Sequence, residues 1–289
     1  MALKNQIRLP AIVFLISISM AILIAAGSAS AQAKRPRRPA PASGSSPAQI
    51  QKLRAAVKAN PKNHEAHNAL GLALAKIGQI NPAIAEFKES VRLKPDYAEG
   101  WLNLGSAGEQ KGDFTAALES YRKASEIKPD DAQLRIKTGS LLLRLQRLDD
   151  AAIEFNRAVQ LDPESAEIRT NLGFLLGQMG DLSGSLSQFE EAVRIKPDLA
   201  QAHYYLGVGR LISNDLDKAI SSFRQFNKLK PGDAEALQSL GSALLRRGDP
   251  ADLPETLKVL RQSLKLRPNQ EVEEMLRKAE ELSKERIKN

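Results

Sequence analysis

The sequence of 289 residues contains no cysteine, and aromatic residues make up only 4% of it, with a single Trp. The missing thiols exclude disulfide bonds, thiolate nucleophiles and cysteine metal sites, and they leave the redox compartment open. With so few aromatics, the apolar 42% of the chain rests mainly on Ala, Leu and Ile. This composition suits closely packed helices better than a β-sandwich, which favours β-branched and aromatic side chains.

The net charge of +8 is not evidence for a nucleic-acid-binding surface, because most of it lies near the N-terminus. Residues 1–31 contribute +2 and residues 32–47 contribute +4, so residues 48–289 carry only +2. The part of the chain that we expect to fold is nearly neutral and shows no basic stripe for phosphates. We expect no nucleic-acid partner.

Sequence motifs for catalysis and cofactor binding are missing as well. There is no Walker A loop, no G-x-S-x-G motif and no Rossmann glycine fingerprint. His64 and His67 form H-x-x-H instead of the H-E-x-x-H zinc motif, and no third ligand lies in register. Glutamate recurs at one position of the units, as Glu65, Glu99, Glu167 and Glu235. Helix capping and a favourable interaction with the helix dipole explain this row better than a metal-binding role does. We therefore expect no catalytic, cofactor or metal site and no enzymatic activity.

The N-terminus has the layout of an export signal. Lys4 and Arg8 precede an apolar run over residues 11–27, and small residues follow up to Ala31. This pattern predicts a signal peptide over residues 1–31, cut after Ala31. The alternative is an uncleaved membrane anchor, although 17 residues would span only about 25 Å as a helix. Both interpretations place the rest of the chain outside the cytoplasm, as a periplasmic or extracellular protein or one anchored in the membrane.

Residues 32–47 are rich in Pro, Ala and Ser. Such a segment buries little apolar area, so the composition predicts a disordered linker. The alternative is contact with an anionic membrane surface through its four cations, which are Lys34, Arg35, Arg37 and Arg38.

Prolines at a fixed interval of 34 residues organise the rest of the chain; they stand at positions 61, 95, 129, 163, 197 and 231. A seventh follows after 37 residues at position 268, which indicates a three-residue insertion. The repeating units are residues 64–97, 98–131, 132–165, 166–199, 200–233 and 234–270. A period in this range is typical of a repeat array, whose units bury their apolar faces only by stacking on neighbours.

Each unit repeats the same chemistry at the same positions. The eighth residue is always glycine: Gly71, Gly105, Gly139, Gly173, Gly207 and Gly241. The twenty-fourth is aromatic in five units: Phe87, Tyr121, Phe155, Phe189 and Phe223. Small residues at the eighth and twentieth positions predict the crossing point of two helices, with the aromatic ring filling the space between them. In the last unit, Thr256, Leu260 and Ser263 replace the usual residues and predict looser packing.

Signals for helix ends agree with two helices per unit. We expect N-caps at Asp96, Asp130 and Asp198 for first helices, and at Asn81, Thr115, Asp149, Ser183 and Asp217 for second helices. First helices should close near Gly78, Gly112, Gly180, Asn214 and Gly248. Residues 48–61 and 271–289 read as N-terminal and C-terminal capping helices.

This pattern resembles the tetratricopeptide repeat (TPR). The second unit matches most fully, through Trp101, Leu104, Gly105, Ala117, Tyr121, Ala124 and Pro129. The resemblance covers about residues 64–270, or six repeats. It implies an all-α fold, a right-handed α-solenoid of six stacked helix-turn-helix repeats with flanking capping helices. It also implies a scaffold that binds proteins.

Known members usually hold an extended peptide or a helix in the concave groove lined by the first helices. Carried over by position, the groove residues are Leu102, Asn103, Ile136, Lys137, Asn171, Phe174, Tyr204, Tyr205 and Val208. Chaperone-binding members hold a terminal carboxylate with a Lys and Asn clamp, and this groove lacks the full set. Its apolar centre instead predicts a protein or peptide with apolar anchors, with Tyr204 as the main contact. For Leu102 and Ile136 the alternative is packing between adjacent helices.

Two functions follow from these patterns. The first is an exported scaffold for protein–protein interactions in the periplasm or cell envelope. The second is a non-catalytic recruiting or regulatory subunit of an envelope enzyme complex, of the polymer synthase or glycosyltransferase type. Self-association through the groove or an end repeat is a further alternative.

Overall fold

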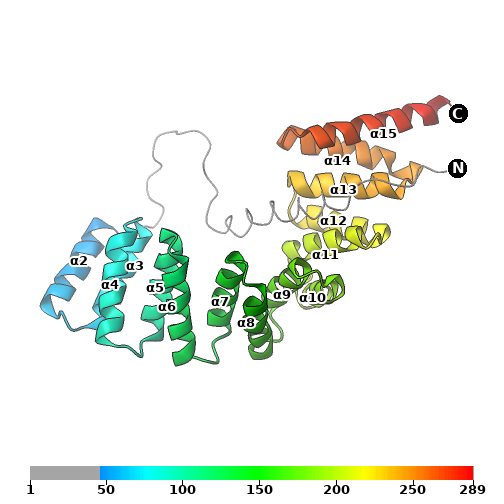
Figure 1. Ribbon diagram of the computed structural model, residues 1–289. Helices are drawn as coiled ribbons and strands as arrows, with labels where there is room; N and C mark the ends of the chain where they lie inside the picture. Colours follow the sequence, from blue (N-terminus) through cyan, green and yellow to red (C-terminus); the bar gives the residue numbers. More distant parts are fainter. Residues whose placement is uncertain (1–45, 289) are drawn as a thin grey trace.

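The computed structural model describes residues 46–288, and within this range every regular element is helical. The predicted signal peptide and all but the last two residues of the predicted linker lie outside the described residues. Figure 1 shows the helices following one another along an arc, with α2 and α15 at its two ends. No helix among these residues is long and apolar enough to span a membrane.

Six consecutive helix pairs make up most of the arc. The pairs are α3 (His64–Lys76) and α4 (Ile80–Leu93), α5 (Ala98–Lys111) and α6 (Phe114–Ile127), α7 (Ala132–Arg144) and α8 (Leu148–Leu161), α9 (Ala166–Gln178) and α10 (Leu182–Ile195), α11 (Ala200–Ile212) and α12 (Leu216–Leu229), and α13 (Ala234–Arg247) and α14 (Leu253–Leu266). Helices α2 (Pro47–Ala59) and α15 (Gln270–Lys288) flank them. Helix α2 begins inside the predicted linker, because Ser46 caps it and accepts a hydrogen bond from the backbone N–H of Gln49.

The hydrophobic core is shared between successive pairs. Its largest cluster runs without interruption from α6 to α11 and includes Tyr121, Phe155, Phe189 and Leu206. Each second helix packs on its own first helix and also on the first helix of the next pair. A single pair therefore has no interior of its own, and the stacking of neighbours creates the core.

The recurring glycine lets the two helices of a pair approach. A Cβ atom built on Gly207 would lie 2.7 Å from Cε1 of Phe223, and one built on Gly71 would lie 2.6 Å from the same atom of Phe87. Both rings are fully buried. The aromatic ring thus fills the space that a side chain at the glycine would need, and this explains why both residue types repeat together.

The turn within each pair requires a left-handed residue. Gly78, Gly112, Gly180 and Gly248 have φ between 72° and 87° there. The same turn position holds Asn214 in the fifth unit, with φ 61°, and Gln146 in the third, with φ 59°. Glutamine in this conformation is strained, because its Cβ crowds the backbone. The sequence pattern had not marked Gln146.

The predicted N-caps are wrong by one or two residues. First helices are capped two residues after the proline, by the side chains of Asn63, Asp131, Ser165 and Asp233. Tyr97 and Leu199 occupy this position in the other two units and provide no side-chain cap. Second helices begin two residues earlier than predicted, and Asp113 and Asp181 cap two of them. The cap thus lies one residue later than predicted in first helices and two residues earlier in second helices, where the turn within each pair is shorter than expected.

The last pair is packed as well as the others, contrary to the sequence prediction. Thr256, Leu260 and Ser263 are all buried, and Leu260 lies against Gly241 as the aromatic rings do in other units. The Ser263 hydroxyl donates a 2.8 Å hydrogen bond to the carbonyl of Ala234 in the partner helix. The three-residue insertion forms a short 3-10 helix, Pro250–Asp252, between α13 and α14.

The two ends of the array carry polar residues where internal repeats carry small ones. Gln49 of α2 stands 34 residues before the fully buried Ala83, and it is exposed. Arg277 is the eighth residue of α15, the position of the recurring glycine in first helices, and it is also exposed. Only the inner faces are apolar: Ile50 in α2 and Val272 and Ala279 in α15 are buried.

Candidate functional site

The first helices lie on the inner side of the arc. Neighbouring first helices contact one another, as in α3 with α5, α7 with α9, α9 with α11 and α11 with α13. No pair of successive second helices makes a contact of this extent among residues 46–288. When one helix layer is closer together than the other, the array curves toward it. The first helices therefore form the concave face (Figure 1).

The fourth residue of each first helix ties the start of that helix to the preceding proline turn. In five units its side-chain nitrogen donates to the carbonyl of the proline six residues earlier. The donors are His67, Trp101, Arg135, Arg169 and His203, at 2.8 to 3.0 Å for the shortest contact of each. Leu237 stands at this position in the sixth unit. In the other five units, this hydrogen bond fixes the start of the first helix relative to the preceding proline turn, and so helps to orient the helix on the concave face.

These contacts give His67 and His203 a structural role. The Nδ1 atom of His67 also lies 2.7 Å from a carboxylate oxygen of Glu86 on α4. Arg135 makes the same connection in the third unit, where it pairs with Glu154 at 3.1 Å. Within the described residues, no group of three or more His, Asp or Glu side chains is arranged to hold a metal ion.

The aromatic centre predicted for the groove is part of the core. Phe174 is 9% exposed and Tyr205 is 6% exposed. Their rings lie 5.7 Å apart, and the Tyr205 ring lies 5.4 Å from that of Phe189 on the second helix of its neighbour. Burial raises the pKa of Tyr205. The structure corrects the prediction for these two residues: they hold the fourth and fifth units together and are not surface anchors.

Tyr204, the predicted main contact, is half-buried between the fifth and sixth units. Its ring centroid lies 5.3 Å from that of Phe226 and 6.0 Å from that of Phe223, both on α12. Burial, and then the nearby charge of Glu235, raise the pKa of Tyr204. Leu102 and Ile136 are likewise half-buried against the main core cluster, and Val208 against the next one. For these four residues, packing uses most of the side chain.

The polar residues of the predicted set remain on the concave surface. Asn103 donates a 2.9 Å hydrogen bond to Asn68 of the preceding first helix. Asn68 in turn donates to Tyr97 and to Glu99. Asn171 is half-buried and Lys137 is exposed. The concave face therefore offers amide, carboxylate and ammonium groups more than the apolar surface that the sequence predicted.

Tyr97 lies in the turn before α5, next to these hydrogen-bonded Asn and Glu side chains. Its hydroxyl donates to Glu99 at 3.1 Å, and its ring meets the edge of His64 at a centroid distance of 4.9 Å. Burial, followed by the charge of Glu99, raises its pKa to about 12. The sequence analysis missed Tyr97 because it meets Glu99 and the buried Asn68 only when the first two units stack.

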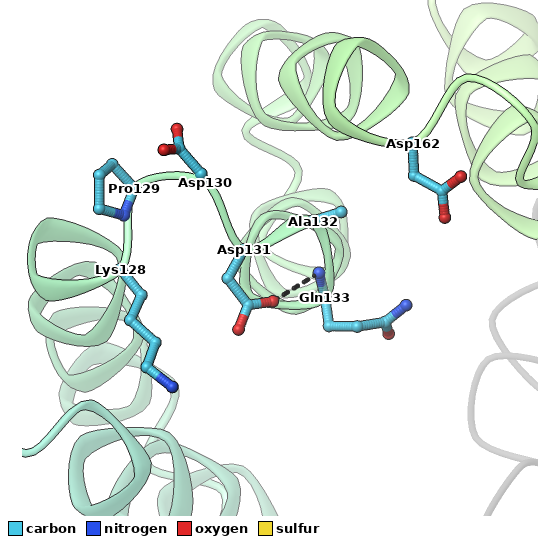
Figure 2. Close-up of a pocket in the computed structure, with 7 residues that line it drawn as sticks. All are labelled: Lys128, Pro129, Asp130, Asp131, Ala132, Gln133 and Asp162. Carbon is cyan, nitrogen blue, oxygen red and sulfur yellow. Dashed lines mark hydrogen bonds between the residues drawn. The ribbon is translucent and has the colours of Figure 1, made fainter.

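A depression of about 520 Å³ lies beside the turn between α6 and α7, at the start of the third unit (Figure 2). Three carboxylates line it, Asp130, Asp131 and Asp162, together with Lys128, Pro129, Ala132 and Gln133. Figure 2 shows Asp131 turned to the start of α7, where it accepts from the backbone N–H of Gln133 at 2.9 Å. Helix capping accounts for Asp131, and no histidine lines the depression.

Comparison with protein-family models gives one consistent result. A model described as tetratricopeptide repeat matches residues 50–97, 69–132 and 170–234, and a second one, described as TPR repeat, matches residues 139–180. No curated protein sequence matches the chain.

Solved structures with a similar fold include three helical-repeat proteins. PilF of Pseudomonas aeruginosa is 19% identical with a TM-score of 0.62, over 72% of this chain and 94% of that one. YrrB, titled a TPR protein with an unusual peptide-binding site, is 22% identical with a TM-score of 0.56, over 66% and 98%. The APC/C hetero-tetramer Cut9–Hcn1 is 19% identical with a TM-score of 0.59, over 80% of this chain but only 46% of its own.

At these identities the similarity shows the fold alone, and the chain spans about half the length of the Cut9–Hcn1 match. The family models, the period of 34 residues and the stacked helix pairs agree. The chain is a member of the tetratricopeptide-repeat family.

Proposed function

We propose that this chain is a non-catalytic scaffold that binds other proteins on its concave face, outside the cytoplasm. The observation that supports this most is the distribution of side chains on the first helices. Their apolar residues join those of the second helices in the core, whereas polar side chains such as Asn103, Lys137 and Asn171 stay at the inner surface. Polar groups that a core does not need are available to a partner.

The fold of the similar structures supports a binding role. YrrB is titled as a protein with a peptide-binding site, and Cut9–Hcn1 is titled as a hetero-tetramer. A solenoid offers one long surface and no enclosed pocket, and this favours extended or helical partners over small molecules.

The export proposal rests on the sequence of residues 1–31, with its two cations, apolar run and small residues before Ala31. N-terminal sequencing of the protein from its native cells should give a chain that begins at Gln32. A chain that begins at Met1 or Ala2 would contradict cleavage.

Site-specific photo-crosslinking tests the binding role. A photoreactive phenylalanine in place of Gln133, which is exposed on the concave side of α7, should capture a partner in intact cells. The same group in place of Gln160, exposed on second helix α8, is the matched control and should capture less. Equal capture from both positions would argue against the concave face. A stoichiometric enzyme among the captured proteins would favour the alternative function, a recruiting subunit of an envelope enzyme complex.

A further inference from the structure

Helix α7, in the middle of the array, differs in charge from the other first helices. It contains Arg135, Lys137 and Arg144 and no Asp or Glu. Arg135 is buried and bonded to Glu154 and to the carbonyl of Pro129. Lys137 and Arg144 are exposed, and neither forms an ion pair with any carboxylate in residues 46–288. Two cations on the concave side therefore have no internal counter-charge.

The carboxylates of the neighbouring first helices are already engaged. On α5, Glu99 accepts from Tyr97 and Asn68, and Glu109 accepts from the Tyr121 hydroxyl at 2.5 Å. On α9, Glu167 pairs with Lys196 at 2.7 Å. These acids are held by groups of their own or the preceding repeat, so they do not neutralise α7. Lys111, exposed at the end of α5, adds a third cation on the side of the preceding repeat.

The positions of Lys137 and Arg144 on the helix determine how far apart two negative groups of a ligand must be to meet both. Lys137 and Arg144 are seven residues apart, which is two helical turns or about 10.5 Å along the axis. The guanidinium of Arg144 is held over the ring of Phe114, 4.3 Å from its centroid, so its position is restricted. Between the two cations, Ser140 is the half-buried residue of α7, and the residues around it are buried. The surface thus combines two positive ends, of which Arg144 is held in place, with a small middle.

We propose that the concave face of α7 binds an internal, acidic segment of a partner protein in an extended conformation. In a polyproline-II-like segment, side chains three residues apart project on one side at a spacing of about 9.3 Å, which matches the two cations. Its carboxylates pair with Lys137 and Arg144, and the two residues between them pass over Ser140. This inference rests on the proposed binding function and names the chemistry that the same face recognises.

A synthetic peptide gives a direct test. The probe is a fluorescent nonapeptide, Leu-Glu-Pro repeated three times, with its C-terminus amidated. Fluorescence anisotropy with the full chain should show binding that weakens as salt rises, because exposed charge pairs are screened. The same peptide with Gln in place of each Glu should bind at least about tenfold more weakly, since it lacks two ion pairs.

Matched variants locate the site. The double variant K137Q/R144Q should lose about tenfold in affinity for the acidic peptide. The control R122Q/R157Q removes two exposed cations of second helices α6 and α8 and should bind as the wild type does. The reversed variant K137E/R144E should prefer a peptide with Lys in place of each Glu. Circular dichroism spectra that match the wild type would show that these surface changes leave the fold intact.

Three results would overturn the inference. One is no binding of the acidic peptide at millimolar concentration, and another is equal binding by K137Q/R144Q and the wild type. The third is binding only when the peptide has a free C-terminal carboxylate, which would mean that the concave face recognises a C-terminus and not an internal segment. None of these results would change the outcome of the photo-crosslinking at Gln133, which tests the scaffold role separately.

Discussion

Replacing Gly207 with Ala tests whether close helix crossing, and not helix propensity, determines the recurring glycine. The new Cβ would lie 2.7 Å from Phe223, against 3.4–4 Å for ordinary contact. The buried ring or the α11 backbone must move, and overpacking of this kind costs about 1–3 kcal/mol. The 2.7 Å approach places this cost in the upper half of that range. Ala gains about 1 kcal/mol over Gly in a helix, so we expect a net destabilisation of about 1–2 kcal/mol.

Gly139→Ala is the matched control, because it makes the same chemical change at the same position of another repeat. Its Cβ would lie 3.1 Å from Phe155, so the ring needs to move only a few tenths of an ångström. The gain in helix propensity and the cost of moving the ring should nearly cancel, so the free energy of unfolding should change little. Urea unfolding followed by circular dichroism gives the free energies, and hydrogen exchange shows whether the loss centres on α11 and α12. The reasoning fails if Gly207→Ala is as stable as the wild type, or if Gly139→Ala is the less stable variant.

Three further changes test other contacts. Gln146→Gly removes the left-handed strain at φ 59° and should stabilise the protein by about 1 kcal/mol in urea; a loss of stability would contradict this. Trp101→Phe removes the 2.8 Å hydrogen bond to Pro95 and should cost about 1 kcal/mol beyond lost packing, whereas equal stability would mean that the tie contributes nothing. The folded-state pKa of Tyr97, about 12, lies above its usual 10.0. The contribution of Tyr97 to the free energy of unfolding should therefore be complete below pH 10 and decline as pH rises toward 12. Tyr97→Phe should remove this decline when stability is measured at alkaline pH.

The sequence was sufficient to predict the fold because its strongest signal is periodic. Prolines recur every 34 residues, the glycine repeats in all six units and the aromatic residue in five, so one correct alignment describes all six. Details that vary between units were harder to predict. Gln146 adopts the left-handed turn only because the helices on both sides impose it, and no local preference of glutamine reveals this.

The predicted groove was less accurate because repeat position does not determine exposure. Tyr205 and Asn103 occupy the same position in their repeats, yet Tyr205 is buried against Phe189 while Asn103 lies on the concave surface. A long aromatic side chain reaches the neighbouring pair and packs there, whereas a short amide cannot. The cations of α7 and the absence of acids between residues 132 and 144 are visible in the sequence, but the lack of ion-pair partners for Lys137 and Arg144 within residues 46–288 becomes apparent only in the structure.

The polar residues at the two ends limit how this architecture can grow. For another copy to continue the array at α2 or α15, Gln49 or Arg277 would have to enter a dry interface where the repeats have Gly, Ala or, in two units, the small residues Ser185 and Thr256. An unpaired guanidinium in such a place is strongly unfavourable. Open-ended fibres built by joining copies through these ends are therefore disfavoured, and a longer relative would arise by duplication of internal units, with both terminal helices retained.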